Sequence, residues 1–282
     1  MKRYLTLILL LACMSSIYSQ KKDLRNAKKD LDKGNFDKAE VSINAAESFL
    51  SSMDEKQKSE FYLLKSKFLL RGGAAGPEDT KLSVSSFEKV SEPFDDQSKE
   101  IHLIDLINHL INSGSGYIEK NDFSTASDYF FDAYRISKKD TIYLYYAASS
   151  SVNAKDYPKS LSMYEELKSL GFTGIEKQYF ALNKMTNMNE SFDSKLLRDA
   201  SIKAKTHINP SEKNSKSRYP EIIKNMALIY NQMGEVDKAL GAMNEARAEN
   251  PDDLNLILTE ANVYYAMGNI DKFKSLLEYA TE

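Results

Sequence analysis

Cysteine is almost missing from this chain of 282 residues, because the only one is Cys13. A disulfide within the chain and a metal site built from several thiolates are therefore excluded. If the first 19 residues are removed on export, no thiol remains, which also excludes a cysteine nucleophile. We expect packing alone to hold the fold together.

Charge of one sign is also lacking, since 38 basic residues face 41 acidic ones and the formal net charge is −3. Sequence-independent nucleic-acid binding needs clustered positive charge. The one basic cluster, at residues 21–29, is interrupted by Asp23 and continues into Asp30 and Asp32, so we interpret it as a solvated helix face. Nucleic acid is not an expected partner.

With 42% apolar and 28% charged residues, the composition is typical of a globular protein.

A long apolar run is absent too. The apolar stretch at residues 5–12 has about eight residues, whereas a bilayer-spanning helix needs about 20. It follows a short positive segment, Met1-Lys2-Arg3-Tyr4, and precedes a small polar stretch, as in a secretory signal. We therefore predict a signal peptide at residues 1–19 and an exported protein of the periplasm or cell envelope.

The processing route has three alternatives. The favoured cut follows Ser19 and leaves Gln20 first. The segment Leu10-Leu11-Ala12-Cys13 resembles a lipoprotein box, which would lipidate Cys13 and give an outer-membrane lipoprotein. An uncleaved apolar tail on a cytoplasmic protein is the third. A membrane is an expected partner only if Cys13 is lipidated.

What the chain does contain is a repeat of 34 residues. The segment Gly234-Glu235-Val236-Asp237-Lys238-Ala239 returns as Gly268-Asn269-Ile270-Asp271-Lys272-Phe273. Apolar residues within each half of a unit recur three, four and seven apart, which indicates helices. The turn between the halves needs a left-handed backbone, and the sequence places there Gly34, Asn121, Lys155, Gly234 and Gly268. A period of this length predicts a helix–turn–helix solenoid.

The order of residue types resembles the tetratricopeptide repeat (TPR) family. In the clearest unit the matching residues are Ile223, Ala227, Tyr230, Gly234, Val236, Ala239, Met243, Ala246 and Pro251. The last unit matches through Ala280, although no unit has Trp at the bulky position and only one has the closing Pro. The resemblance implies an all-α, right-handed superhelical solenoid whose concave groove binds a protein or peptide segment.

We place about seven TPR-like helix pairs behind the signal peptide. They lie near residues 20–53, 55–91, 107–140, 141–174, 175–207, 220–253 and 254–282, with the second and fifth degenerate. The polar stretch at 210–218 is predicted to be a mobile loop. The last helix closes at Glu282 without the polar capping helix usual in solenoids, so we expect either a truncated chain or an open end that stacks on a partner or on itself.

Candidates for chemistry are few. The glycine-rich residues 72–76 precede Pro77-Glu78 rather than the Lys-Ser/Thr pair of a phosphate loop. His102, Asp105 and His109 share one helix face, which makes a metal site and an enzymatic role a rival hypothesis; we favour ordinary surface or half-buried side chains. No nucleophile elbow or interpretable Ser/His/Asp grouping is present. We predict no catalytic residue, metal, cofactor or small-molecule substrate.

The repeat register also projects ten residues onto the groove. They are Ile111, Tyr145, Ser149, Val152, Lys224, Leu228, Asn231, Leu258, Asn262 and Tyr265. Tyr145 suits recognition because tyrosine gives a large contact area at low entropic cost, although packing between neighbouring units is the alternative interpretation. The clamp of basic and Asn groups found in chaperone-binding TPR members is not reproduced. The sequence therefore predicts a non-enzymatic interaction scaffold or assembly adaptor of the bacterial cell envelope; the lipoprotein alternative would act in envelope assembly or nutrient uptake.

Overall fold

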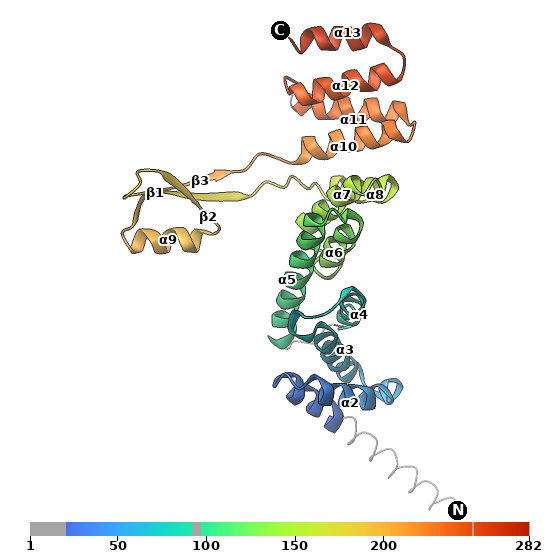
Figure 1. The fold of residues 1–282 in the computed structure, drawn as a ribbon, viewed down its shortest axis with the longest axis vertical. Helices are drawn as coiled ribbons and strands as arrows, with labels where there is room; N and C mark the ends of the chain where they lie inside the picture. The colour runs from blue at the N-terminus through green and yellow to red at the C-terminus, as the bar shows by residue number, and fades with distance from the viewer. Residues whose placement is uncertain (1–20, 92–96, 250, 282) are drawn as a thin grey trace, which may run out of the picture. The chain divides into compact units, whose positions relative to one another are not determined.

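The computed structural model describes residues 21–91, 97–249 and 251–281, so the predicted signal peptide lies outside the described residues. The chain divides into two compact units, of which the first ends at Asp156 and the second begins at Tyr157. Both are built mainly of α-helices (Figure 1). In the part of the chain that the structure describes, no helix is both long and apolar enough to cross a membrane.

The first unit is a series of helices that pack against their neighbours in the chain. Residues 21–31 are helical and precede the first labelled element. The remaining helices are α2 (Phe36–Glu47), α3 (Glu55–Leu70), α4 (Pro77–Phe87), α5 (Gln97–Glu119), α6 (Phe123–Ile136) and α7 (Ile142–Asn153). α3 packs on α4, α5 on α6, and α6 on α7.

Polar residues start several of these helices. The Gln57 amide donates to Asp54 Oδ1 at 2.8 Å, and the Asp54 amide donates to Gln57 Oε1 at 3.1 Å, which is a capping box at the start of α3. Asp122 caps α6, since its side chain accepts from the Thr125 amide at 3.1 Å. At the start of α2, by contrast, the Asn35 side chain makes no capping bond.

The predicted turn residues adopt the left-handed conformation. Their φ angles are 70° at Gly34, 59° at Asn121, 61° at Lys155, 76° at Gly234 and 73° at Gly268. For Lys155 this conformation costs about 1 kcal/mol, because its Cβ crowds the following carbonyl. The helical-hairpin repeat is therefore confirmed at the turns.

Small residues allow the helices of a pair to approach closely. Ala39, Ala126, Ala227 and Ala239, all at predicted repeat-core positions, are fully buried. Gly114 on α5 lies against the Phe130 ring on α6, where an added Cβ would be 2.9 Å from Phe130 Cε1. The crossing of α5 and α6 therefore requires the hydrogen atom of a glycine at this point.

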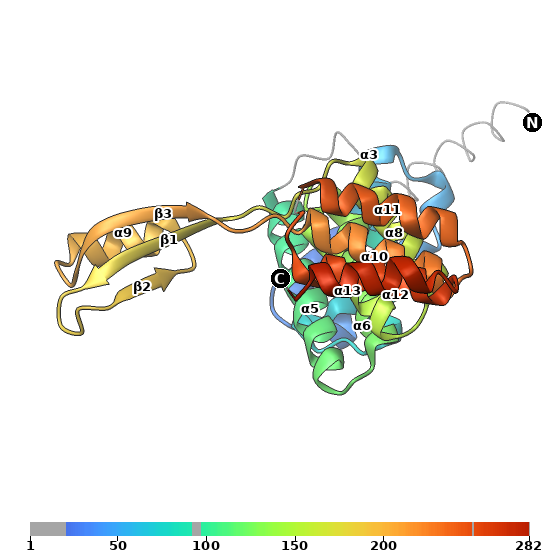
Figure 2. The ribbon, with the colours of Figure 1, turned by 90° about the horizontal axis from the view of Figure 1, so that it is seen from above.

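The second unit combines helices with one small sheet. Its elements are α8 (Tyr157–Ser169), β1 (Lys177–Asn183), β2 (Asn189–Phe192), α9 (Lys195–Lys203), β3 (His207–Asn214), α10 (Tyr219–Gln232), α11 (Val236–Glu249), α12 (Leu254–Ala266) and α13 (Ile270–Tyr279). α10 packs on α11, α11 on α12, and α12 on α13, and Figure 2 shows these helices side by side. Six of the seven predicted TPR-like repeats thus contain helices where we expected them.

The fifth predicted unit, near 175–207, is wrong. Its residues form β1, β2 and α9, and the stretch at 207–214, which overlaps the predicted mobile loop at 210–218, forms β3. The strands pair antiparallel in the order β2-β1-β3, and α9 packs on the sheet (Figure 1). The sequence of β1 explains why this segment is not a helical hairpin. Its apolar residues 179–182 are adjacent in the chain, so they cover both faces of a strand rather than one face of a helix.

This α/β insertion, defined as residues 176–216, interrupts the array without ending it. α8 packs on α10, where Asn225 Nδ2 donates to the Tyr164 hydroxyl at 3.0 Å. The two ends of the insertion meet, since the Ser215 amide donates to the Glu176 carbonyl at 2.8 Å. The stack of repeats therefore continues from α8 to α10. In the last two repeats, the first helices, α10 and α12, lie next to each other.

Candidate partner-binding surfaces

Two neighbouring helices of the second unit, α10 and α12, present the predicted groove residues on one face. α10 carries them at intervals of four and three, α12 does the same, and the two helices pack together. Leu228 and Leu258 are each 37% exposed and Tyr265 is 61% exposed. We call the face formed by Lys224, Leu228, Asn231, Leu258, Asn262 and Tyr265 the C-terminal groove face.

Tyr265 is the largest exposed side chain on this face. Its ring packs against Phe273 of α13, with ring centroids 5.1 Å apart and planes tilted by 50°. This contact restricts the ring, so a partner that covers it loses little side-chain entropy. Tyr265 thus has the properties of an anchor for recognition.

A polar hollow of about 520 Å³ lies at the amino-terminal end of the same face. Glu221 and Lys224 line it from α10, and Asn255 and Leu256 line it from α12. Asp253 caps α12 at its edge by accepting from the Asn255 amide at 2.9 Å and the Leu256 amide at 3.3 Å. The face therefore runs from a polar hollow to an apolar end.

The groove residues of the first unit are less accessible. Tyr145 is only 5% exposed, and its ring lies against Tyr146 at 5.8 Å, so the packing alternative applies to it. Ile111 packs against the buried core beside Leu110, and Ser149 and Val152 are half-buried. None of these four predicted residues offers an exposed apolar anchor like Tyr265.

The rival metal hypothesis concerns a hollow of about 860 Å³ in the first unit, which is lined by His102, Asp105 and His109. His102 Nε2 hydrogen-bonds with Ser66 Oγ at 2.8 Å, and His109 Nε2 with Thr80 Oγ1 at 2.9 Å. Across the described ranges, no group of three His, Cys, Asp or Glu side chains is arranged to hold a metal ion. The hydroxyl partners give both imidazoles a structural role.

Burial sets the titration of these histidines. It lowers the pKa of His102 to about 3, helped by the positive charge of Lys67. Burial also lowers the pKa of His109, opposed by a backbone hydrogen bond at Gly73. Both rings are therefore neutral at pH 7, and His102 contacts Phe87, with ring centroids 5.9 Å apart.

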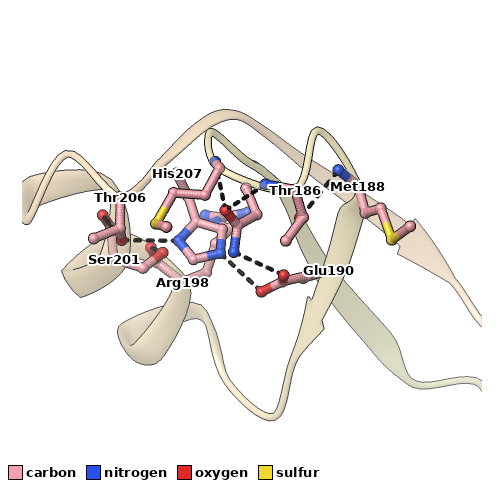
Figure 3. A network of polar contacts seen from close by, with 9 residues as sticks. Thr186, Met188, Glu190, Arg198, Ser201, Thr206 and His207 are labelled. Carbon is pink, nitrogen blue, oxygen red and sulfur yellow. Dashed lines mark hydrogen bonds and ion pairs between the residues drawn. The ribbon is translucent and has the colours of Figure 1, made fainter.

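The insertion contains a polar network that sequence reasoning missed (Figure 3). Glu190 accepts from Asn183 Nδ2 at 2.8 Å and pairs with His207 Nε2 at 3.0 Å, while His207 Nδ1 hydrogen-bonds with Thr206 Oγ1 at 2.9 Å. The hydrogen bond from His207, followed by that from Asn183, lowers the pKa of Glu190. The run of consecutive apolar residues from Tyr179 to Leu182 was the available signal for this sheet.

A second set of contacts holds α9 on the sheet. Arg198 is buried, and its guanidinium pairs with Asp199 at 2.8 Å and Glu212 at 3.2 Å. It also lies over the Tyr179 ring, 5.4 Å from the centroid. These contacts cross-link α9, β1 and β3, so the insertion has its own internal structure.

Stacked helical hairpins with an exposed groove face define a helical-repeat protein, a class that uses extended surfaces to bind partners. The family model of the tetratricopeptide repeat matches residues 218–282. This match confirms TPR units in the segment that contains α10 to α13, where the resemblance in the sequence was clearest. No curated protein matches the chain.

Solved structures of helical-repeat proteins show distant similarity. MamA has 12% identity and a TM-score of 0.41, covering 79% of this chain and 90% of its own. A tetratricopeptide repeat protein from Parabacteroides merdae has 14% identity and a TM-score of 0.38, covering 94% and 79%. PilF of Pseudomonas aeruginosa has 11% identity and a TM-score of 0.36, covering 92% and 89%.

Proposed function

We propose that the protein is a non-enzymatic scaffold or assembly adaptor that binds a protein segment along the C-terminal groove face. One observation carries the proposal. Adjacent first helices α10 and α12 leave Leu228, Leu258 and Tyr265 exposed on one face, beside a polar hollow. An extended or helical segment with apolar side chains fits such a surface, and the flanking polar groups would fix its register.

The location we propose is the envelope of a bacterium, after export. Support comes from the positive start and short apolar core of residues 1–12 and from the near absence of cysteine. The second candidate is an outer-membrane lipoprotein, favoured by the segment that ends at Cys13. Intact mass of the exported protein distinguishes them, because a chain that starts at Gln20 excludes an anchor at Cys13.

The test is cross-linking and capture of partners from native envelopes. Y265A and L228A each remove an exposed apolar anchor, so we expect each to weaken capture about tenfold while thermal unfolding changes little. K224E should act in the same direction by changing the charge of the hollow.

Matched controls carry the leucine-to-alanine and lysine-to-glutamate substitutions at other exposed positions. L82A changes an exposed leucine of α4, and K274E an exposed lysine of α13. Both should capture partners like the unsubstituted protein. Equal capture by Y265A, L228A and the controls would rule out the C-terminal groove face as the binding surface.

A further inference from the structure

The far end of the insertion exposes apolar side chains on a tight turn. Met185 is 95% exposed and Met188 is 68% exposed, both in the turn that joins β1 to β2. Ile208, at the start of β3, is 39% exposed. Because the Lys184 amide donates to the Thr206 carbonyl at 3.0 Å, the turn and the segment before β3 lie together. We call residues 183–188 and 203–208 the tip.

The backbone amides of this turn are already satisfied. The amides of Met185 and Thr186 donate to Asn183 Oδ1 at 2.8 and 3.3 Å. The Asn187 amide donates to the Asn183 carbonyl at 2.9 Å, and the Met188 amide donates to Thr186 Oγ1 at 3.3 Å. An exposed turn can leave its amides to water, whereas a turn that enters an apolar medium must satisfy them internally.

Positive charge surrounds the tip. Lys184, Lys203 and Lys205 are exposed and form no ion pair with any residue that the structure describes. The nearby acid, Glu190, is held by His207 and Asn183. The whole insertion has eight Lys and Arg against five Asp and Glu, a net charge of +3 in a chain of −3. Its charge is therefore complementary to an anionic surface.

The polar network in Figure 3 joins the tip to the rest of the insertion. Thr206 Oγ1 donates to the Ser201 carbonyl at 3.0 Å and hydrogen-bonds with His207, which pairs with Glu190. These bonds connect the end of α9, β2 and the start of β3. The tip is thus presented by a connected support, so little ordering entropy is lost when it contacts a surface.

We infer that the tip is a peripheral contact site for an anionic phospholipid bilayer. The methionines enter the interface between headgroups and acyl chains, and the lysines reach the lipid phosphates with their long side chains. A turn whose amides are satisfied enters this region without leaving unpaired donors. An acidic protein is less favoured as the occupant, because the same turn offers it few backbone donors for specific hydrogen bonds.

The absence of tryptophan from the chain allows a local test. M185W places a single indole at the tip of the full chain, purified from cells that process its amino terminus. Vesicles of phosphatidylcholine mixed with phosphatidylglycerol should shift its emission to the blue, and brominated lipids should quench it. Because the signal comes from the tip alone, an anchor at Cys13 does not produce it.

M233W is the matched control, since Met233 is also exposed but lies at the end of α10. Its emission should not change with vesicles. K184Q/K205Q should weaken the vesicle response of M185W about fivefold for each lysine. K195Q/K216Q removes two other lysines of the insertion outside the tip and should have a smaller effect. High salt should reverse the response.

Two results would overturn the inference. One is an emission of M185W that stays unchanged with anionic vesicles, or that responds equally to phosphatidylcholine alone and is insensitive to the lysine substitutions. The other is a site-specific cross-link from residue 185 to an acidic envelope protein together with no response to vesicles, which would assign the tip to an acidic protein partner.

Discussion

In the first unit, the close approach of α5 and α6 depends on the absence of a side chain at Gly114. Gly114 faces the Phe130 ring on α6, whereas Gly116, two residues further along α5, has no atom within 4 Å of an added Cβ. Both glycines are in the same helix, where alanine has the higher helix propensity. The pair therefore separates the effect of packing from that of propensity.

We predict that G114A lowers the free energy of unfolding by about 1–3 kcal/mol, because the new methyl group overlaps the Phe130 ring. G116A should instead raise it by about 0.5–1 kcal/mol through helix propensity alone. Urea unfolding followed by circular dichroism measures both. Equal effects of the two substitutions would show that α5 and α6 do not meet at Gly114.

Some of these residue roles were readable from the sequence. Gly34, Asn121 and Lys155 were assigned to turns because a left-handed backbone is a local requirement. The exposure of Tyr145 and Tyr265 was not readable, although the repeat register gave both the same assignment. One is 5% exposed and the other 61%, since exposure depends on which neighbouring helix covers the side chain.

Among the elements, the insertion is the clearest addition to the repeat. Its open sheet has two edge strands, and β3 departs from regular pairing between the partners of Phe180 and Leu182, near Asn209 with φ of 52° and Pro210. A bulge with a proline on an edge strand discourages pairing with other chains. The sheet is thus suited to presenting its tip rather than to adding strands.

We predict that replacing residues 176–216 by a short Gly/Ser linker leaves the helical stack intact. The ends of this segment are hydrogen-bonded to each other, and α8 contacts α10 directly through Tyr164 and Asn225. Helical circular dichroism and the melting temperature should stay close to those of the intact chain, while binding to anionic vesicles, measured by co-sedimentation, is lost.

A large fall in melting temperature on this deletion would contradict the prediction, because it would mean that the sheet supports the stack. Loss of the polar network alone, in E190Q, serves as the comparison. It should loosen the insertion, as measured by hydrogen exchange in β1, without changing the melting of the helices.

At the scale of the whole molecule, each repeat is stabilised by its contacts with the neighbouring repeats. In the second unit, Arg247 of α11 pairs with Glu260 of α12, with Nη1 and Oε2 2.7 Å apart, and Arg247 Nη2 also donates to the Pro251 carbonyl at 3.2 Å. Glu260 is buried, so this pair joins the last two repeats in a partly desolvated contact.

We predict that E260A lowers stability by about 1–3 kcal/mol, because it leaves the Arg247 guanidinium without its charged partner. K238A removes an exposed pair with Glu235 within one repeat and should change stability by less than about 0.5 kcal/mol. Thermal unfolding of both variants checks this. If E260A melts like K238A, the contact does not couple the two repeats.

The sequence by itself determined the helical hairpins, their period and their turns, because the identity of a residue and its spacing act locally on the backbone. Only the tertiary structure decided that residues 176–216 form a sheet, that Tyr145 is covered, and that Met185 is presented beside Lys184 and Lys205. These outcomes depend on segments distant in the chain, and on which of their side chains a neighbour removes from water.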